Sequence, residues 1–467
     1  MKKIYILPIL LSPLIMSCGD SPKVENSRPG PDPSPKPVVT DFYISPASSG
    51  CLMEVSRRNF EGIRAIVGHG YDVTGDYLAP SSLRASVVDT ERMPDDAFSV
   101  FSAPAYNSGE TYLGEDAGSL LSDLMANLGE SADGANRDYY FTGTIGQASS
   151  NSSYVMQTTW QRYVIAGFPG TDVTVRRYLS DEFTADLALL SADGLVRKYG
   201  THFISRASAG LAMREIYSAY LPSAGTDLAP LLDGFRAASA SIEGAFNGVL
   251  ADKLSSLYNY GARLNVTFIG GKTDVVEYDE EKAILASIDE WWKTGESGNY
   301  GLIDISGLHP LSVAIADREL AAQVDASIRK YISEAQTKLE RNIPLFQNCD
   351  GLVYRYVASA EASAALDKSG IKSYGVLGAL SSEPTETTPL PLYSNLDTDG
   401  NQILSLIQPT VEWKRLGYVL KERTETCVPL YEISDGTRYA YTIEAANSYG
   451  KKNEWHPTGA VFYLLRP

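Results

Sequence analysis

The amino-acid sequence predicts an α+β protein, with antiparallel strands, helical clusters and a separate β-rich C-terminal domain. Residues 154–165 are rich in aromatic and β-branched side chains with polar alternation, typical of an antiparallel strand with one solvated face. Apolar side chains recur at three-to-four spacing across 228–257 and 320–339, as in amphipathic helices. We expect a long helix from 311 to about 341 and a helical segment that opens at Ser180 and Asp181. From residue 345 onward, short strand-like runs alternate with turn residues.

Length and composition describe a globular chain that does not bind nucleic acid. The 467 residues suggest two or three domains, and an apolar fraction of 44% is sufficient for a large core. A formal net charge of −17 disfavours nucleic acid and non-specific attraction to anionic lipid. Any membrane role would therefore depend on apolar insertion or on a specific receptor.

The N-terminal residues predict export. After two lysines, the apolar stretch 4–16 is too short and too interrupted by proline to span a bilayer. Ile15-Met16-Ser17-Cys18 resembles a bacterial lipobox, so we expect a lipoprotein signal peptide at 1–17 and lipidation of Cys18. The alternative is a plain secretory signal with a chance cysteine. Residues 18–41 are rich in proline and serine, and are expected to form a semi-rigid tether.

The first folded segment, about 42–105, contains the run Gly68-His69-Gly70-Tyr71-Asp72. The Gly-x-Gly pair is shared with dinucleotide-binding loops. Gly75 is misplaced as the third glycine, however, and no helical pattern begins there. A dinucleotide-binding loop is therefore not supported.

Two segments fit a helix and a strand about equally well. In 107–138, apolar residues from Leu120 to Leu128 follow helical spacing and also alternate with polar ones. In 222–261, a long helical stripe includes Ile242–Leu250, which alternates as well. Weak amphipathic helices often give the same ambiguity.

Between these segments lies the most distinctive motif, Tyr199-Gly200-Thr201-His202-Phe203, followed by Gly210. It resembles the signature of the membrane attack complex/perforin (MACPF) family: aromatic-Gly-Thr/Ser-His-aromatic, six residues, then Gly-Gly. Leu211 replaces the second glycine of the closing pair. The alternative is a buried strand in which His202 is a hydrogen-bonded core residue.

The resemblance implies a bent, twisted antiparallel central sheet flanked by helical clusters, as in MACPF proteins and cholesterol-dependent cytolysins. It covers residues 42–342. It implies that Gly68, Gly70, Gly270 and Gly271 are glycines at which the sheet bends. It also implies that 107–138 and 222–261 are the helical clusters that become transmembrane hairpins in lytic members. The alternative is that these helices pack on the sheet and never leave it.

The β-rich domain at 343–467 is a candidate targeting module. Cys349 and Cys427 are the expected disulfide pair, with Cys51 left as a buried free thiol; no Cys-x-x-Cys spacing supports a zinc site. Aromatic residues there could contact glycan or lipid, or be ordinary sheet residues: Tyr393, Trp413, Tyr418, Tyr439, Tyr441, Tyr449 and Trp455.

A calcium loop is considered at Asn395-x-Asp397-x-Asp399-Gly400. Leu406 occupies the twelfth position, where a glutamate would be expected, so a plain Asp-Gly turn is favoured.

The sequence predicts neither an enzyme nor a cofactor or metal. It contains no His-Glu-x-x-His, Gly-x-Ser-x-Gly or Walker motif. Its four histidines are His69, His202, His309 and His456. A two-carboxylate glycosidase is the remaining catalytic alternative, since acidic residues are plentiful.

Taken with the resemblance, the sequence predicts a secreted or surface-anchored lipoprotein of the outer membrane. It would oligomerise on target membranes and permeabilise them as an antimicrobial toxin. The expected partners are copies of itself, the target membrane and a surface receptor, which could be lipid, glycan or outer-membrane protein. The alternative is a non-lytic adhesin or a host- or glycan-binding lipoprotein, which Leu211 and the weak alternation favour.

Overall fold

The computed structural model describes residues 41–45, 53–54, 63, 66–102, 107–127, 152–221, 228–242, 262–272, 275–279, 284–295, 299–336, 342–351, 353–398, 400, 402–424, 427–443 and 455–465. The expected signal peptide, Cys18, Cys51, Asp399 and nearly all of the tether lie outside these residues. So do parts of both ambiguous segments.

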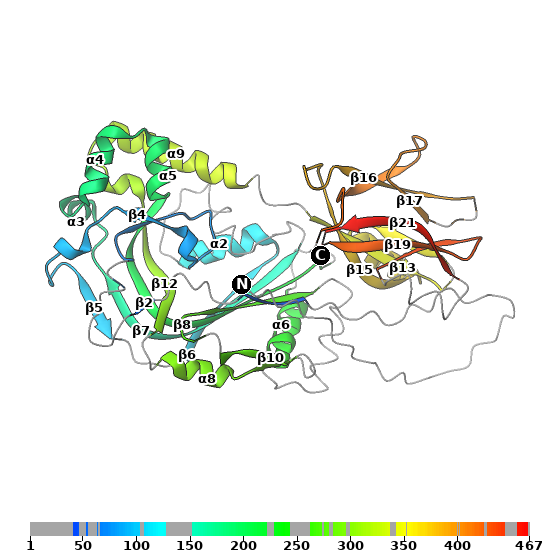
Figure 1. Ribbon diagram of the computed structural model, residues 1–467, viewed down its shortest axis with the longest axis horizontal. Helices are drawn as coiled ribbons and strands as arrows, with labels where there is room; N and C mark the ends of the chain where they lie inside the picture. Colours follow the sequence, from blue (N-terminus) through cyan, green and yellow to red (C-terminus); the bar gives the residue numbers. More distant parts are fainter. Residues whose placement is uncertain are drawn as a thin grey trace.

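A ten-stranded sheet forms the centre of the first domain (Figure 1). Its longest strand, β8 (His202–Ala219), pairs along its length with β7 (Ser153–Gly167). On its other side, the first part of β8 pairs with β12 (Asn299–Pro310) and the last part with β9 (Arg263–Ile269). The remaining strands are β1 (Asp41–Ser45), β2 (Met53–Glu54), β3 (His69–Tyr71), β4 (Leu83–Ser86), β5 (Ser99–Ser102) and β6 (Asn107–Gly114).

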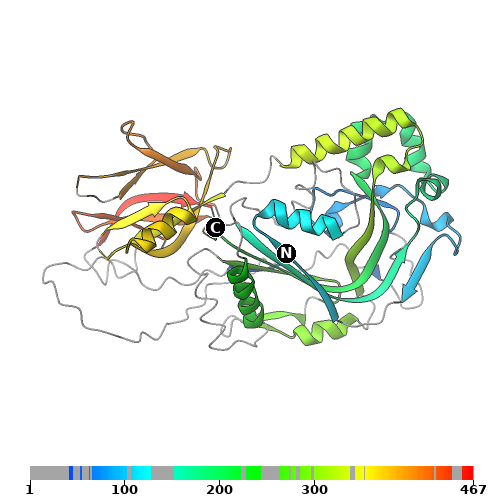
Figure 2. The ribbon, with the colours of Figure 1, turned by 180° about the vertical axis from the view of Figure 1, so that it is seen from behind.

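The sheet is bent and mainly antiparallel, as the family resemblance implies. Figure 2 shows β7 and β8 running along the lower part of the domain and then turning upward. The pairing registers shift at the turn, between Arg162 and Val164 on β7 and between Leu302 and Asp304 on β12. Such irregularities bend a strand and increase its local twist. One exception to the antiparallel pattern is β1, which runs parallel to β9.

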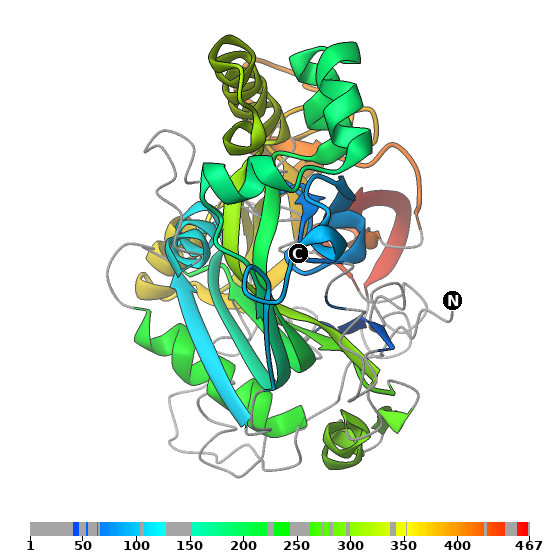
Figure 3. The ribbon, with the colours of Figure 1, turned by 90° about the vertical axis from the view of Figure 1, so that its left-hand side faces the viewer.

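Helices cover both faces of the sheet (Figures 2 and 3). On the concave side, α2 (Ala117–Asn127) packs with Leu120, Leu121 and Leu124 buried. On the convex side lie α6 (Ala229–Ile242) and α8 (Ile288–Thr294). At the far end of the upper half are α3 (Asp172–Arg177), α4 (Asp181–Leu189), α5 (Ala192–Tyr199) and α9 (Arg318–Gln336). The short elements are η1 (Pro80–Ser82), η2 (Thr90–Arg92), β10 (Glu277–Asp279) and β11 (Ile284–Ala286).

The helix expected from residue 311 begins later. Residues Leu311–Ala314 form a 3-10 turn, and α9 starts at Arg318. The carboxylate of Asp317 accepts hydrogen bonds from the backbone N–H groups of Glu319 and Leu320, at 2.8 and 3.1 Å. This capping satisfies donors that would otherwise lack helical partners, and it sets the start of the helix.

The C-terminal region contains a six-stranded sheet, ordered β14-β13-β15-β18-β16-β17, and a three-stranded sheet, ordered β20-β19-β21. Short bridges from Ala379 to Leu465 and from Leu420 to Tyr463 join the two sheets. Its elements are β13 (Asn342–Cys349), β14 (Tyr354–Val357), α10 (Ala360–Lys368), β15 (Lys372–Ser381), β16 (Leu390–Leu396), β17 (Gln402–Ser405), β18 (Lys414–Val419), β19 (Val428–Ser434), β20 (Tyr439–Thr442) and β21 (His456–Leu464).

The disulfide expected between Cys349 and Cys427 is not formed, and both residues are free thiols. Cys349 ends β13 of the six-stranded sheet, whereas Cys427 precedes β19 of the three-stranded sheet. The Cys349 sulfur is buried and accepts a hydrogen bond from the Gly351 N–H at 3.2 Å. Burial also raises the pKa of the Cys349 thiol, which keeps it protonated.

Among the described residues, no helix is long and apolar enough to cross a membrane. The segment around Asn395 and Asp397 forms the β16–β17 hairpin, in which the Gly400 N–H donates to the Asp397 carbonyl at 3.1 Å.

Candidate functional site

The signature motif joins α5 to β8 through a conformation that favours glycine. Tyr199 is the last residue of α5, and Gly200 follows with φ at 81°. A Cβ atom at Gly200 would lie 2.5 Å from the Tyr71 carbonyl oxygen. Gly70 is equally constrained, because a Cβ there would lie 1.8 Å from the Tyr199 carbonyl oxygen. The helix end and β3 therefore pack backbone against backbone.

Thr201 and His202 complete this junction by hydrogen bonding. The N–H and the hydroxyl of Thr201 both donate to the Tyr71 carbonyl, at 3.0 and 3.2 Å. The same hydroxyl oxygen accepts from the Val73 N–H at 3.2 Å and lies 2.9 Å from His202 Nδ1. Burial, with a smaller contribution from His309, lowers the pKa of His202 to about 3. The imidazole is neutral at physiological pH, so its role here is structural.

The ring of Tyr199 anchors the helical cluster. Its hydroxyl donates to Asp186 Oδ2 at 2.7 Å, and its ring lies edge-on to Phe183, with centroids 4.8 Å apart. Lys198 forms ion pairs with Asp186 and with Glu182. The first aromatic position of the signature thus links α4 and α5 to the start of β8.

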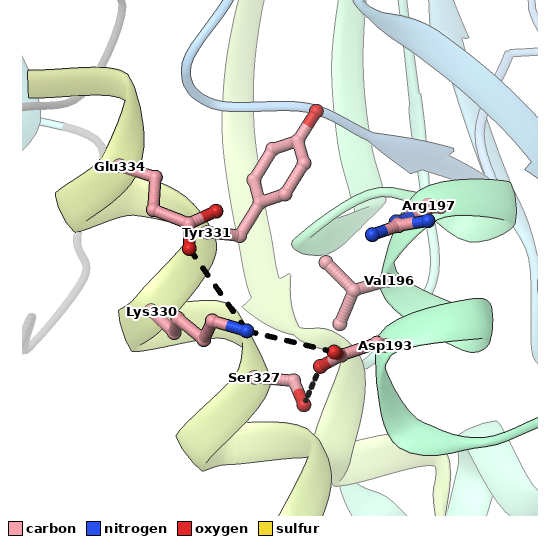
Figure 4. A pocket seen from close by; sticks show the side chains of 7 residues that line it. All are labelled: Asp193, Val196, Arg197, Ser327, Lys330, Tyr331 and Glu334. Carbon is pink, nitrogen blue, oxygen red and sulfur yellow. Dashed lines mark hydrogen bonds and ion pairs between the residues drawn. The ribbon is translucent and has the colours of Figure 1, made fainter.

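A shallow groove lies between α5 and α9, and its side chains fasten the two helices (Figure 4). Ser327 donates to Asp193 at 2.6 Å, and Lys330 Nζ lies 3.7 Å from the same carboxylate. At the edge of the groove, the Tyr331 hydroxyl donates to Asp72 Oδ2 at 2.9 Å. Arg84 pairs with that oxygen at 2.7 Å. These bonds connect α9 to the strands beside the signature.

The bend of the sheet is built on two facing glycines. Gly210 lies opposite Arg162 of β7 on one side and Gly301 of β12 on the other. A Cβ at Gly210 would lie 2.0 Å from the Gln161 carbonyl oxygen. A Cβ at Gly301 would lie 2.9 Å from the Gly270 nitrogen. The strands approach so closely at the bend that neither position has room for a side chain.

The convex side of the bend is filled by α8 and by Leu211. Gly270 and Gly271 have φ of 75° and 68°, and the Trp291 indole N–H donates to the Gly270 carbonyl at 3.2 Å. The fully buried Leu211 side chain lies 3.1 Å from the position of a Cβ at Gly271 and 2.8 Å from that at Gly295. The leucine that replaces the signature's last glycine therefore occupies space between these two glycines.

The structure places the four glycines singled out in the sequence at two locations. Gly270 and Gly271 lie at the bend, beside Gly301 and Leu211. Gly68 and Gly70 lie beside the signature, where the Gly68 N–H donates to the Ile204 carbonyl at 2.7 Å.

The concave side of the bend carries a polar cluster. Arg162 Nη2 lies 2.9 Å from Asp304 Oδ2, and its guanidinium carbon lies 4.5 Å from the centre of the Trp160 ring. The Tyr77 hydroxyl lies 3.4 Å from Asp304 Oδ1. Burial raises the pKa of Asp304, and the Arg162 charge partly offsets this. The buried Arg214 donates to the Tyr77 carbonyl at 2.6 Å.

Both ambiguous segments leave the sheet from the same row of residues. Pairing registers align Gly114 of β6, Tyr154 of β7, Ser218 of β8 and Arg263 of β9 across the sheet. The first segment, 107–138, begins with β6, a strand where a helical cluster was expected, and continues into α2. The second follows β8 and contains α6. In α6, Leu231 and Phe235 are buried, and the Phe235 and Tyr217 ring centroids lie 6.3 Å apart. Residues 128–138, 222–227 and 243–261 lie outside the described part of the chain.

These features occur in the combination that the family resemblance implies: a bent antiparallel sheet, helices on both faces, and the signature at the start of the central strand. The fold is of the MACPF type.

Comparison with solved structures found several chains that are similar to this one at low sequence identity. GNIP1Aa from Chromobacterium piscinae is 13% identical, covers 86% of this chain and 82% of its own, and has a TM-score of 0.49. A MAC/Perforin-domain protein from Bacteroides thetaiotaomicron is 13% identical, and the match covers 77% of this chain and 70% of that protein, with a TM-score of 0.46. Suilysin from Streptococcus suis, a cytotoxin, is 12% identical, and the match covers 45% of this chain and 40% of suilysin, with a TM-score of 0.19. No family model and no curated protein matches the sequence.

Sequence reasoning missed several residues of the MACPF bend. Gly295 and Gly301 were not singled out, because glycine is common in this chain and their packing partners are distant in sequence. One feature of the sequence could have pointed to the Arg162–Asp304 pair: each residue is a charge within a strand-like run. Nothing in the sequence indicates that the two charges meet.

Proposed function

We propose that this chain is a pore-forming MACPF protein that oligomerises on a target membrane and permeabilises it. The observation that carries the proposal is the shared row of Gly114, Tyr154, Ser218 and Arg263. Two antiparallel strand pairs end there, and a chain segment containing a helix joins the strands of each pair. Each pair could lengthen into a β-ribbon without a change of register.

The segments are long enough for this conversion. The chain between β6 and β7 (115–152) and the chain between β8 and β9 (220–262) each span about 40 residues, whereas two membrane-crossing strands need roughly 9–11 residues apiece. Unpacking the helices exposes buried leucines and Phe235, at about 1.5–3 kcal/mol for each side chain. Burial of apolar side chains in lipid must offset that cost. In lipid, only a closed barrel satisfies every backbone group, so assembly must accompany insertion.

Assembly would pair the edges of the sheet in neighbouring copies. β6 lies at one edge of the sheet's lower half, and β1, which pairs with the outer side of β9, lies at the other. Head-to-tail pairing of different edges is a heterologous association, and it closes into a ring when the rotation between copies allows.

In this proposal the protein is an exported lipoprotein, with Cys18 lipidated after removal of 1–17, anchored at the outer membrane or cell surface or released. It acts as an antibacterial toxin. The domain at 343–467 selects the target through a lipid, glycan or outer-membrane protein receptor.

A second candidate is a non-lytic adhesin or glycan-binding lipoprotein that keeps the fold and forms no pore. The packing of Leu211 between Gly271 and Gly295 favours it, because a filled bend resists opening. The two candidates differ in whether α2 and α6 ever leave the sheet.

A reversible crosslink tests the proposal. Tyr217→Cys with Phe235→Cys is designed to join α6 to β8 near their ring contact. Asn395→Cys with Ile403→Cys, which face each other in the β16–β17 hairpin, is the control pair. We expect the oxidised α6 pair to block dye release from target cells and reduction to restore it, with the control pair active in both states. Binding to cells without leakage from any of these proteins would favour the adhesin.

A further inference from the structure

Two aliphatic side chains stand in solvent on one loop of the C-terminal region. Ile407 is 75% exposed and Val411 is 95% exposed, and both lie in residues 406–413 between β17 and β18. Large aliphatic residues are usually buried, and in the described part of this chain most of them are. Two highly exposed aliphatic side chains on a single loop are therefore unusual and need a physical explanation.

Hydrogen bonds within the loop hold these side chains in place. The Ser405 hydroxyl donates to the Ile407 carbonyl at 2.7 Å and accepts from the Ile407 N–H at 3.0 Å. The Trp413 N–H donates to the Thr410 carbonyl, and the Gln408 side chain donates to the Trp413 carbonyl, both at 3.3 Å. The loop is thus pre-formed, which lowers the entropic cost of binding through it.

Aromatic and cationic side chains surround the base of the loop. Trp413, Tyr393 and Tyr418 are partly exposed, and Lys414 and Arg415 are exposed. The register of β16 and β18 places Tyr393 opposite Arg415, whose guanidinium carbon lies 5.0 Å from the centre of the Tyr418 ring. Exposed aliphatic side chains close to tryptophan, tyrosine and cationic side chains match the chemistry of a membrane–water interface.

We propose that the 406–415 loop is the surface by which this protein first binds a lipid bilayer. Ile407 and Val411 enter the headgroup region, while Lys414 and Arg415 contact lipid phosphates. This rests on the proposed function, since it supplies the membrane contact that a pore requires. A glycan fits the loop less well, because its most exposed side chains offer neither hydrogen bonds nor a flat stacking face. Within 406–415, Lys414 and Arg415 outnumber the single acidic residue, Glu412, so this segment suits an anionic surface better than the chain as a whole, of net charge −17.

The test uses the full-length protein and sedimentation with vesicles of phosphatidylcholine alone or mixed with phosphatidylglycerol. We expect the double variant I407S/V411S to bind both vesicle types at least about tenfold more weakly than wild type, with thermal unfolding unchanged. The matched control is V173S, which removes a side chain that is 75% exposed on α3 and should change nothing. K414E/R415E should weaken binding mainly to the anionic vesicles, and the difference should shrink at high salt.

Several outcomes would overturn the inference. One is wild-type protein that binds neither vesicle type, and another is I407S/V411S binding that equals wild type. A third is binding to cells that both variants lose but that prior protease treatment of the cells also abolishes, which would indicate a protein receptor. Dye release distinguishes failure of this inference from failure of the proposed function. If I407S/V411S releases dye as wild type does, the loop proposal is wrong and the pore proposal stands. If binding depends on the loop but no dye is released, the pore proposal is wrong and the loop proposal stands.

Discussion

Arg162 and Asp304 form an ion pair that bridges the two neighbours of β8 at the point where the sheet bends, with Nη2 and Oδ2 2.9 Å apart. Arg162 lies opposite Gly210 and Asp304 opposite Ser208, so the pair crosses β8 above two small residues. The side chains are only 29% and 20% exposed. Breaking such a pair by removing one partner generally costs more than the intact pair contributes, because a buried charge is left behind.

The two ends of this pair should respond differently to neutralisation. Arg162→Gln leaves the Asp304 carboxylate at a buried strand position, and we expect a loss of about 3 kcal/mol in the free energy of unfolding. Asp304→Asn leaves a long arginine that can turn toward solvent, so its loss should be smaller. Urea denaturation at pH 7 measures both, and equal losses would contradict the asymmetry.

The pH dependence of the Asp304→Asn variant should also change. Because burial raises the pKa of Asp304 above its ordinary value, the folded state binds this proton more tightly than the unfolded state. The stability contributed by the group is present below its unfolded pKa and is lost as pH rises through the raised folded pKa. The Asp304→Asn variant should not show this decrease in stability as the pH rises. Denaturation at a series of acidic pH values measures the free energy of unfolding of both proteins. A curve parallel to that of wild type would refute it.

His202 should make the protein less stable in acid. Its folded-state pKa of about 3 lies below the ordinary 6.5, so between these values the unfolded chain binds a proton that the folded chain does not. Stability should therefore fall as pH drops below 6.5, by up to about 1.4 kcal/mol for each pH unit. His202→Gln should flatten the slope, and His309→Gln, where burial also lowers the pKa, should flatten it less. A slope unchanged in His202→Gln would show that other groups cause it.

Leu211 should stabilise the closed bend. Leu211→Ala removes a fully buried side chain beside Gly271 and Gly295, with an expected cost of about 2–5 kcal/mol in the free energy of unfolding. If bend opening limits permeabilisation, the variant should also release dye faster. Leu189→Ala, at a position 77% exposed on α4, is the control and should leave both unchanged. A cost below about 1 kcal/mol would mean that Leu211 is not a packing element.

Much of the fold could be predicted because local patterns determine it. The strand at 154–165, the serine that precedes α4 and the helical spacing in α2 and α6 all depend on neighbours within a few residues. Ser180, for example, accepts from the Phe183 N–H at 3.1 Å, which is why that helix begins where it does. The signature could be recognised from its own five residues, but the contacts of its glycine and its hydroxyl with Tyr71 and Val73 join parts of the chain that are distant in sequence.

What could not be predicted depends on pairing across the sheet. The meeting of Gly210 with Gly301, and of Arg162 with Asp304, follows from register shifts that no local pattern encodes. The cysteine expectation was wrong for a related reason: Cys349 ends a strand of the six-stranded sheet, whereas Cys427 precedes a strand of the three-stranded sheet. The late start of α9 depended on the Asp317 cap, which the apolar stripe alone did not reveal.

The most direct test of the central claim is a fluorescence scan along α6. Single cysteines at successive positions from Leu228 to Ile242, in a background where Cys51, Cys349 and Cys427 are changed to alanine, are labelled with an environment-sensitive dye in solution and on membranes. We predict that dye emission follows helical periodicity in solution and alternates with a period of two residues on membranes, as in a strand with one face in lipid. A helical period that persists on membranes that are leaking would contradict the account.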